Sequence, residues 1–317
     1  MLFKSLCYAL IAGVMLLPVV TAPIALALGV LFSLTVGNPA PEYSQRISTL
    51  LLKACIVGLG FGLPFDVVMK NGAHGLWVSG IGVVTVLLLG LSLGRLFRLN
   101  WQPVHLISAG TAICGGSAIA AVGPVIGARQ SVLSMSLASV FVLNAAALYL
   151  FPFVAHILDL SQRQFAFWAA LAIHDTSSVL GAAASYGDQA LAEATVLKLA
   201  RAMWIVPLVV GFLMVARREK LISGPVAWPL FVVLFVVASA ARSTIPAWQP
   251  AFDIVFSLAQ RGLVLVLFMI GSGLTLELLR QIGWRLFGFA TVLWLLISAL
   301  TLAVVVFFPS VAPSAGQ

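Results

Sequence analysis

Long apolar runs, separated by short polar or proline- and glycine-containing segments, recur along the whole chain of 317 residues. A run of about 17–25 apolar residues is long enough to cross a bilayer as a helix, and the polar punctuation marks where each run stops. The pattern predicts eleven membrane-spanning helices, or ten if the run 2–37 is one helix rather than two broken near Pro18 and Pro23. The expected spans are about 2–20, 21–37, 48–65, 76–94, 104–127, 131–154, 165–186, 195–215, 226–241, 253–276 and 286–308.

Composition supports this assignment, because 62% of the residues are hydrophobic and only 8% are charged. Soluble domains carry roughly 25% charged residues, and disordered chains combine high charge with low hydrophobicity. Both classes are therefore excluded. We expect an all-α polytopic transmembrane helical bundle, with residues 1–317 forming a single membrane domain whose short connections leave no room for another.

The positive charges are unevenly distributed between the predicted loops, and the net charge of +8 follows from them. With the N-terminus inside, the cytoplasmic set is Lys4, Arg46, Lys53, Arg95, Arg98, Arg163, Arg217, Arg218, Lys220, Arg280 and Arg285. The opposite set is Lys70, Arg129 and Arg242. Because Lys and Arg collect on cytoplasmic loops, this bias predicts a multi-pass protein of the inner (plasma) membrane with a cytoplasmic N-terminus and an outside C-terminus. Lys198, Arg201 and Arg261 remain inside predicted spans.

Several partners are not expected from the sequence. Cys7, Cys55 and Cys114 lie in apolar stretches without a CxxC motif, so neither a disulfide framework, a metal site nor a cofactor is indicated. No basic arm suggests nucleic acid. The expected partners are the lipid bilayer and a small anionic substrate, and the apolar exterior offers surface for a homodimer.

The fifth span contains Gly115, Gly116 and Ser117, with Thr111 before them and Pro124 after them. This pattern predicts a break, which at membrane depth is tolerated only where the backbone is buried in protein or lines a cavity. The half-helix after the break would present free N–H groups and a positive dipole end to an anion. The alternative is that the small residues only allow close helix packing.

The seventh span contains five consecutive polar residues. They are His174, Asp175, Thr176, Ser177 and Ser178. An acid at the centre of a membrane helix is costly, so an intramembrane Asp beside a His indicates function. A loop, or a serine-rich helix packed on its neighbours, would be the structural alternative.

Two other spans carry candidate site residues. Lys198 and Arg201 are three residues apart and share a helix face, so they are expected to pair with Asp175 or a bound anion, unless they only reach toward the interface. Ser272 and Gly273, after Gly271, predict a second break in the tenth span.

Spans two to six and seven to eleven would begin on opposite sides of the membrane. They predict two inverted five-helix repeats, about 21–154 and 165–308, in which the fifth and tenth spans are equivalent discontinuous helices. The likeness between the segments around Ile113 and Ile173, in the fifth and seventh spans, does not fit that scheme.

The segment 109–117, the His174–Asp175 pair and Lys198-x-x-Arg201 before Pro207 together resemble the YeiH-like family of bacterial inner-membrane proteins, described as sulfate exporters. The acid after the His is often Glu in that family, whereas this chain has Asp175. The family in turn is similar to two-repeat transporters with discontinuous helices.

The resemblance implies a secondary active transporter that exports a small anion such as sulfate or a sulfonate. Substrate would be bound by Thr111, Gly115, Gly116, Ser117, Thr176, Ser177, Ser178, Lys198, Arg201, Ser272 and Gly273, with His174 and Asp175 coupling transport to protons or another ion. A passive anion channel is the alternative. A membrane-embedded enzyme is disfavoured, because the sequence lacks HExxH and GxSxG, and the absence of a Walker motif argues against ATP-driven pumping.

Overall fold

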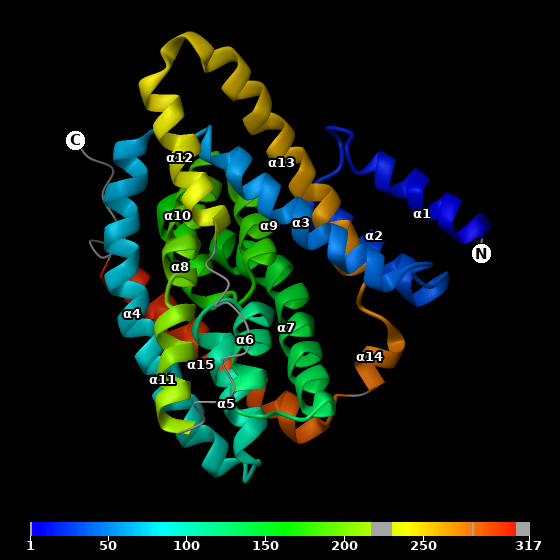
Figure 1. Cartoon of the computed structure of the whole chain (residues 1–317), viewed down its shortest axis with the longest axis vertical. Coiled ribbons are helices and arrows are strands. Elements are labelled where there is room, and N and C mark those ends of the chain that lie inside the picture. Colours follow the sequence, from blue (N-terminus) through cyan, green and yellow to red (C-terminus); the bar gives the residue numbers. More distant parts are fainter. Residues whose placement is uncertain (1, 217–229, 281, 309–317) are drawn as a thin grey trace.

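The computed structural model describes residues 2–216, 230–280 and 282–308, and helices are the regular structure throughout these ranges (Figure 1). The helices are α1 (Leu2–Val14), α2 (Ala22–Thr35), α3 (Pro41–Gly60), α4 (Phe65–Leu96), α5 (Trp101–Ala112), α6 (Gly116–Val125), α7 (Gln130–Ile157), α8 (Gln162–Ala172), α9 (Thr176–Tyr186), α10 (Asp188–Ala202), α11 (Ile205–Ala216), α12 (Leu230–Thr244), η2 (Pro246–Trp248), α13 (Gln249–Gly271), α14 (Leu276–Arg280) and α15 (Trp284–Phe307).

The all-helical class and the membrane character of the chain are confirmed. In the described ranges, five helical segments are long and apolar enough to cross a bilayer: 65–96, 130–157, 188–212, 246–271 and 284–307. The run 2–37 forms two helices, α1 and α2. Residues 226–229 of the predicted ninth span, and the cations Arg217, Arg218 and Lys220, lie outside the described residues. The total of eleven spans and the inverted repeats stay predictions.

Proline and polar residues set several helix starts. Pro23 and Pro41 lie in the first turns of α2 and α3, where the missing N–H costs no hydrogen bond. Ser161 begins α8 with a capping box, in which its hydroxyl accepts from the Gln164 N–H while the Gln164 side chain accepts from the Ser161 N–H.

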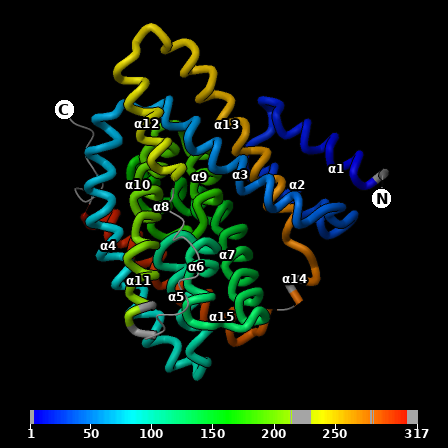
Figure 2. Tube along the Cα trace, viewed as in Figure 1, coloured from blue at the N-terminus to red at the C-terminus, as the bar shows by residue number. Residues whose placement is uncertain are grey.

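The helices pack in two groups (Figures 1 and 2). The first, here called the panel, consists of α2, α3, α12 and α13; the second, the core bundle, consists of α4 to α11 and α15. Within the panel, a Cβ at Gly29 or Gly271 would collide with a backbone carbonyl of the opposite helix, so these glycines allow α2 and α13 to touch. The panel meets the core bundle mainly through α9, which packs on α2 and α13.

The predicted eighth span differs from the structure in two ways. The helix that contains it begins at Asp188 rather than 195: Asp188 and Gln189 are exposed, and the next acid, Glu193, is 7% exposed and pairs with Arg163 at 3.3 Å. The same span also divides after Ala202, close to the point where the ring of Pro207 removes a helical N–H donor.

The second break predicted at Gly271–Gly273 was wrong. The helix α13 ends at Gly271, and a turn leads to the five-residue α14 instead of a second half-helix. The two discontinuous segments that face each other are therefore in the fifth and seventh spans, which is where the sequence showed the unexplained likeness.

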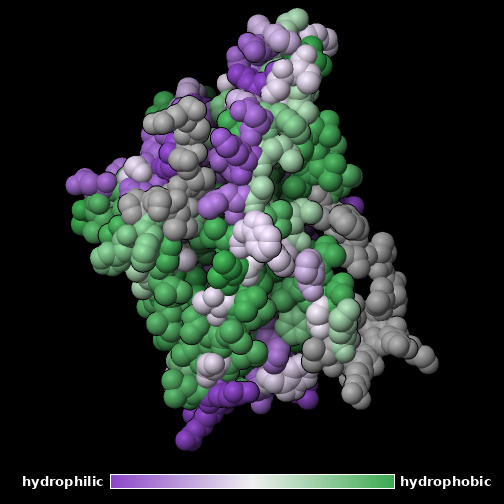
Figure 3. Space-filling view, turned by 90° about the vertical axis from the view of Figure 1, so that its left-hand side faces the viewer, coloured by the Kyte–Doolittle hydropathy of each residue, from purple (hydrophilic) through white to green (hydrophobic). Residues whose placement is uncertain are grey.

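The outer surface agrees with a membrane setting. In Figure 3, hydrophobic side chains cover much of the lower half of one face, while hydrophilic ones gather toward its top and at its bottom edge. Large apolar side chains on α4 are strongly exposed, with Trp77 at 79% and Ile81 at 70%. Such a surface is stable in contact with lipid chains rather than water.

Candidate binding site at two crossed helix breaks

The first break separates α5 from α6 at residues 113–115. Gly115 adopts φ +60° and ψ −115°, which is the first central position of a type II′ turn and is dominated by glycine. Its N–H donates to the carbonyl of Gly110 at 2.8 Å. Gly115 has no side chain to cap α6, and the Cys114 side chain interacts with the Ser117 hydroxyl and the Ala118 N–H. Among the described residues, the open N–H groups at the start of this half-helix are therefore those of Gly116 and Ser117.

The second break separates α8 from α9 at residues 173–175. Asp175 is the N-cap of α9, and its Oδ2 accepts from the N–H of Ser177 at 3.0 Å and of Ser178 at 3.3 Å, as well as from the Ser177 hydroxyl. A carboxylate therefore already occupies the positive end of α9. Of the two half-helices that begin at the breaks, α6 is therefore the one whose N-terminal end has no carboxylate bound to it.

The two breaks lie against each other inside the core bundle. A Cβ built on Gly115 would lie 3.5 Å from the Cβ of His174 and 3.6 Å from Nδ2 of Asn144. Asn144, on α7, accepts from the Asp175 N–H through Oδ1 at 3.3 Å. This bond fixes the amide orientation and points Nδ2 toward the turn at Gly115. Sequence reasoning missed Asn144, although it is the one amide in the apolar span 131–154.

Lys198 and Arg201 bind the carbonyl ends of the half-helices that precede the breaks. Lys198 Nζ donates to the carbonyls of Ile173 at 2.7 Å and Ala170 at 3.4 Å. Arg201 donates to Ala112 through Nε and to Thr111 through Nη2, both at 2.6 Å.

The same guanidinium also reaches α8, where Nη1 donates to the carbonyls of Ala170, at 3.2 Å, and Leu171. Arg201 thus joins the C-terminal ends of α5 and α8, whose unpaired carbonyls carry partial negative charge. Arg201 is 2% exposed and Lys198 is fully buried, so neither reaches toward the interface. In the described part of the chain the ion pairs are Arg163–Glu193 and Arg242–Asp253, and neither involves Asp175.

Several buried polar atoms at the crossing have no hydrogen-bond partner among the residues that the structure describes. They are both ring nitrogens of His174, Nδ2 of Asn144 and Oγ1 of Thr111. Buried polar groups normally have hydrogen-bond partners, so this cluster has donors and acceptors free for a solute or for water. The described residues contain no group of three or more His, Cys, Asp or Glu side chains placed to hold a metal.

The other predicted site residues fall into two sets. Ser117 is exposed and Gly116 half-buried at the start of α6, while Thr176 is half-buried at the start of α9. Ser272 and Gly273 do not join them: the Ser272 hydroxyl bonds with Tyr8 Oη at 3.1 Å and accepts from Asn38 Nδ2 at 3.0 Å, outside the core bundle. The open half-helix start, the unpartnered Asn144 and His174, and the buried cations define the candidate site.

We expect Gly115→Ala to lower the free energy of unfolding by about 1–3 kcal/mol, the usual cost of holding a side chain in so sparsely populated a backbone conformation. The added Cβ would also lie 3.2 Å from Val140 Cγ1. Thermal unfolding in detergent measures the change. Gly82→Ala is the control, because a Cβ there meets nothing within 4 Å in the middle of α4. Equal stability of the two variants would contradict the strained turn.

Comparison with known proteins adds relatives along nearly the whole chain. The family model "Conserved hypothetical protein 698" matches residues 3–290. A UPF0324 membrane protein of Geobacter sulfurreducens is 45% identical over 278 residues, covering 88% of this chain and 88% of that protein.

Similar proteins with the same description occur in Porphyromonas gingivalis and Bacteroides thetaiotaomicron. The former is 44% identical over 286 residues, covering 89% of this chain and 86% of the relative; the latter is 41% identical over 292 residues, covering 91% and 87%. No solved structure matches the chain.

Proposed function

This chain belongs to the UPF0324 family of membrane proteins, which confirms the YeiH-like resemblance, and we propose that it is a secondary active transporter of a small anion. The observation that carries the proposal is the crossing of two broken helices at a cluster of unpartnered polar groups. Discontinuous helices near the midplane provide substrate sites in secondary transporters. The proposed setting is the inner membrane, with the N-terminus in the cytoplasm.

The proposed anion binds at the start of α6. The backbone N–H groups of Gly116 and Ser117, the Ser117 hydroxyl and Asn144 Nδ2 are the donors, and the partial positive charge of the helix start favours a negative ligand. Lys198 and Arg201 add positive electrostatic potential to the site without contacting the anion, because their N–H groups stay hydrogen-bonded to the helix carbonyls. This arrangement differs from the direct ligation by the two cations that the sequence suggested.

Proton or ion coupling is proposed for His174 and Asp175. The two residues are adjacent in the break between α8 and α9. Among the described residues, neither ring nitrogen of His174 has a hydrogen-bond partner. The Asp175 carboxylate is half-exposed beside it, and intramembrane acids and histidines form proton relays in transporters. Sulfate and sulfonates are the first substrates to test, because the family resemblance points to them.

A ligand-stabilisation screen followed by flux measurement tests the proposal. We expect one or more of sulfate, sulfite, sulfonates and carboxylates to raise the melting temperature of the purified protein. The same anion should cross proteoliposomes with saturable kinetics that respond to an imposed proton or ion gradient. Ser117→Ala should weaken the stabilisation, whereas Ser92→Ala, on the exposed side of α4, should not.

The flux measurement also separates the transporter from the alternative channel. Flux that rises linearly with concentration and ignores every gradient would favour a passive anion channel. Stabilisation that persists unchanged in Ser117→Ala and in Lys198→Ala would contradict the anion site at α6.

A further inference from the structure

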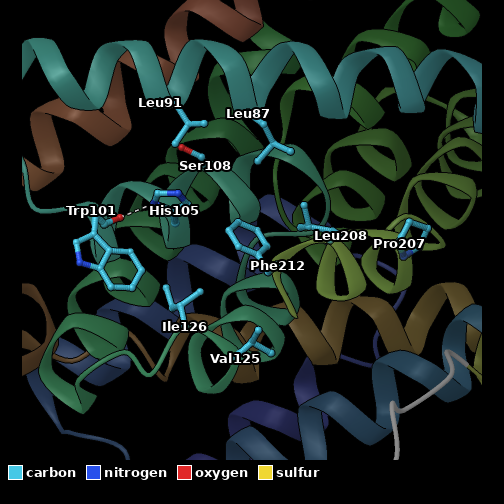
Figure 4. Close-up of a pocket in the computed structure, with 11 residues that line it drawn as sticks. Leu87, Leu91, Trp101, His105, Ser108, Val125, Ile126, Pro207, Leu208 and Phe212 are labelled. Atoms are coloured by element: carbon cyan, nitrogen blue, oxygen red, sulfur yellow. Dashed lines mark hydrogen bonds between the residues drawn. The ribbon is translucent and has the colours of Figure 1, made fainter. Parts of the chain in front are cut away.

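A cavity of about 710 Å³ lies between α4, α5, α6 and α11, away from the crossed breaks (Figure 4). Leu87 and Leu91 of α4 form one wall, and Leu208 and Phe212 of α11 form another. With walls this apolar, the cavity offers little to a small hydrated anion, which would lose its hydration shell without gaining hydrogen bonds. It is therefore distinct in chemistry from the proposed transport site.

The cavity forms where the helix axes of α11 and α4 diverge. The preceding helix α10 packs along α4, and Trp204 Nε1 donates to the Leu76 carbonyl at 3.0 Å. After the break that follows Ala202, α11 packs on α6 instead. The wedge between the diverging helices is open on the outside of the molecule, where Pro207 and Gly211 are exposed.

Polar groups and cations lie toward one end of the wedge. The Ser108 side chain is fully buried against the cavity, and its hydroxyl has no hydrogen-bond partner in the described part of the chain. His105 Nδ1 donates to the carbonyl of Trp101 at 2.7 Å, and Trp101 is 56% exposed at the start of α5. Two exposed cations precede it: Arg95 in the last turn of α4, and Arg98 in the connection that follows.

We propose that this wedge binds one acyl chain of an anionic phospholipid. The chain would lie along the leucines, an ester carbonyl would accept from the Ser108 hydroxyl, and the headgroup would lie near Arg95 and Arg98. An exposed Trp and paired cations mark a membrane interface, and basic pockets between membrane helices bind anionic headgroups. Lipid binding here does not depend on which substrate the protein transports.

The chain offers a variant that fills the wedge without disturbing its walls. Pro207, Leu208, Gly211 and Phe212 share one face of α11, and a Cβ at Gly211 meets nothing within 4 Å. Gly211→Phe therefore places a ring in the cavity. Gly82→Phe is the matched control, since a Cβ at Gly82 also meets nothing within 4 Å, and Gly82 does not line the cavity.

Native mass spectrometry of the detergent-purified protein, after incubation with phosphatidylglycerol or phosphatidylcholine, tests the site. We expect one retained phosphatidylglycerol per wild-type chain, about tenfold lower occupancy in Gly211→Phe, and wild-type occupancy in Gly82→Phe. Arg95→Gln should reduce the preference for phosphatidylglycerol over phosphatidylcholine.

Equal lipid retention in Gly211→Phe and Gly82→Phe would overturn the proposal, as would equal retention of the two lipids by the wild type. Gly211→Leu, a smaller filling residue, gives the same comparison if the Phe variant does not fold.

Discussion

Replacing Arg201 by alanine is expected to abolish transport and to lower the free energy of unfolding by about 3–5 kcal/mol, as for other broken buried charge contacts. The guanidinium donates to the carbonyls of Thr111, Ala112, Ala170 and Leu171. Without it, the ends of α5 and α8 lose their shared donor in a buried part of the core bundle. Hydrogen bonds from charged groups are each worth about 1.5–3 kcal/mol. The net loss is smaller than the sum of the four bonds, because burial of the guanidinium itself costs free energy.

Thermal melting in detergent and proteoliposome flux measure the two effects. Arg261→Ala is the control, because Arg261 donates to one carbonyl, that of Pro18, at 3.2 Å in an exposed position. We expect that variant to lie within about 0.5 kcal/mol of the wild type. An Arg201→Lys variant should recover only part of the stability, since an ammonium lacks the planar fork that reaches two helices at once. Wild-type melting of Arg201→Ala would contradict the bridging role.

Asp175→Asn is expected to abolish transport at nearly wild-type stability. Asparagine caps a helix about as well as aspartate, so the oxygen that accepts from Ser177 and Ser178 is retained while the charge is removed. Asp175→Ala removes the cap as well and should lower stability by about 1 kcal/mol. Flux and melting measured on the same preparations separate the two contributions.

The charge-preserving variant completes that series. Asp175→Glu restores the acid that is often found in the YeiH-like family, with one more methylene, and should retain transport. If Asp175→Asn transports normally, the carboxylate is only a helix cap and the proposal that it couples transport is refuted.

The local sequence predicted where the helices break, because glycine and clustered polar residues act on the backbone beside them. Gly115 lies in a turn that requires a positive φ, and Asp175 caps the half-helix that begins after it. At Gly271 the same reasoning failed, since a helix that ends and a helix that breaks have the same glycine signature. Whether a second half-helix forms beyond such a glycine depends on where the next segment packs.

The partners of Lys198 and Arg201 could not be read from the sequence. Their spacing places both on one helix face and predicts an acid or a bound anion as the partner. The actual acceptors are backbone carbonyls, which every residue possesses and which no sequence pattern distinguishes. Asn144 was missed for a related reason: a single amide in an apolar run gives no periodic signal, and its contact with Asp175 is 31 residues away along the chain.

The Arg201 bridge also constrains the order in which the chain can mature during synthesis. Arg201 is 89 and 90 residues after the α5 carbonyls that it binds, and 30 and 31 residues after those of α8. Both broken helices are therefore synthesised before Arg201, the residue that donates hydrogen bonds to both of them. Until α10 enters the membrane, the nascent α5 and α8 carry exposed carbonyl ends that lipid cannot solvate. Translation must pass residue 201 before these segments can leave a hydrated insertion channel as a finished unit.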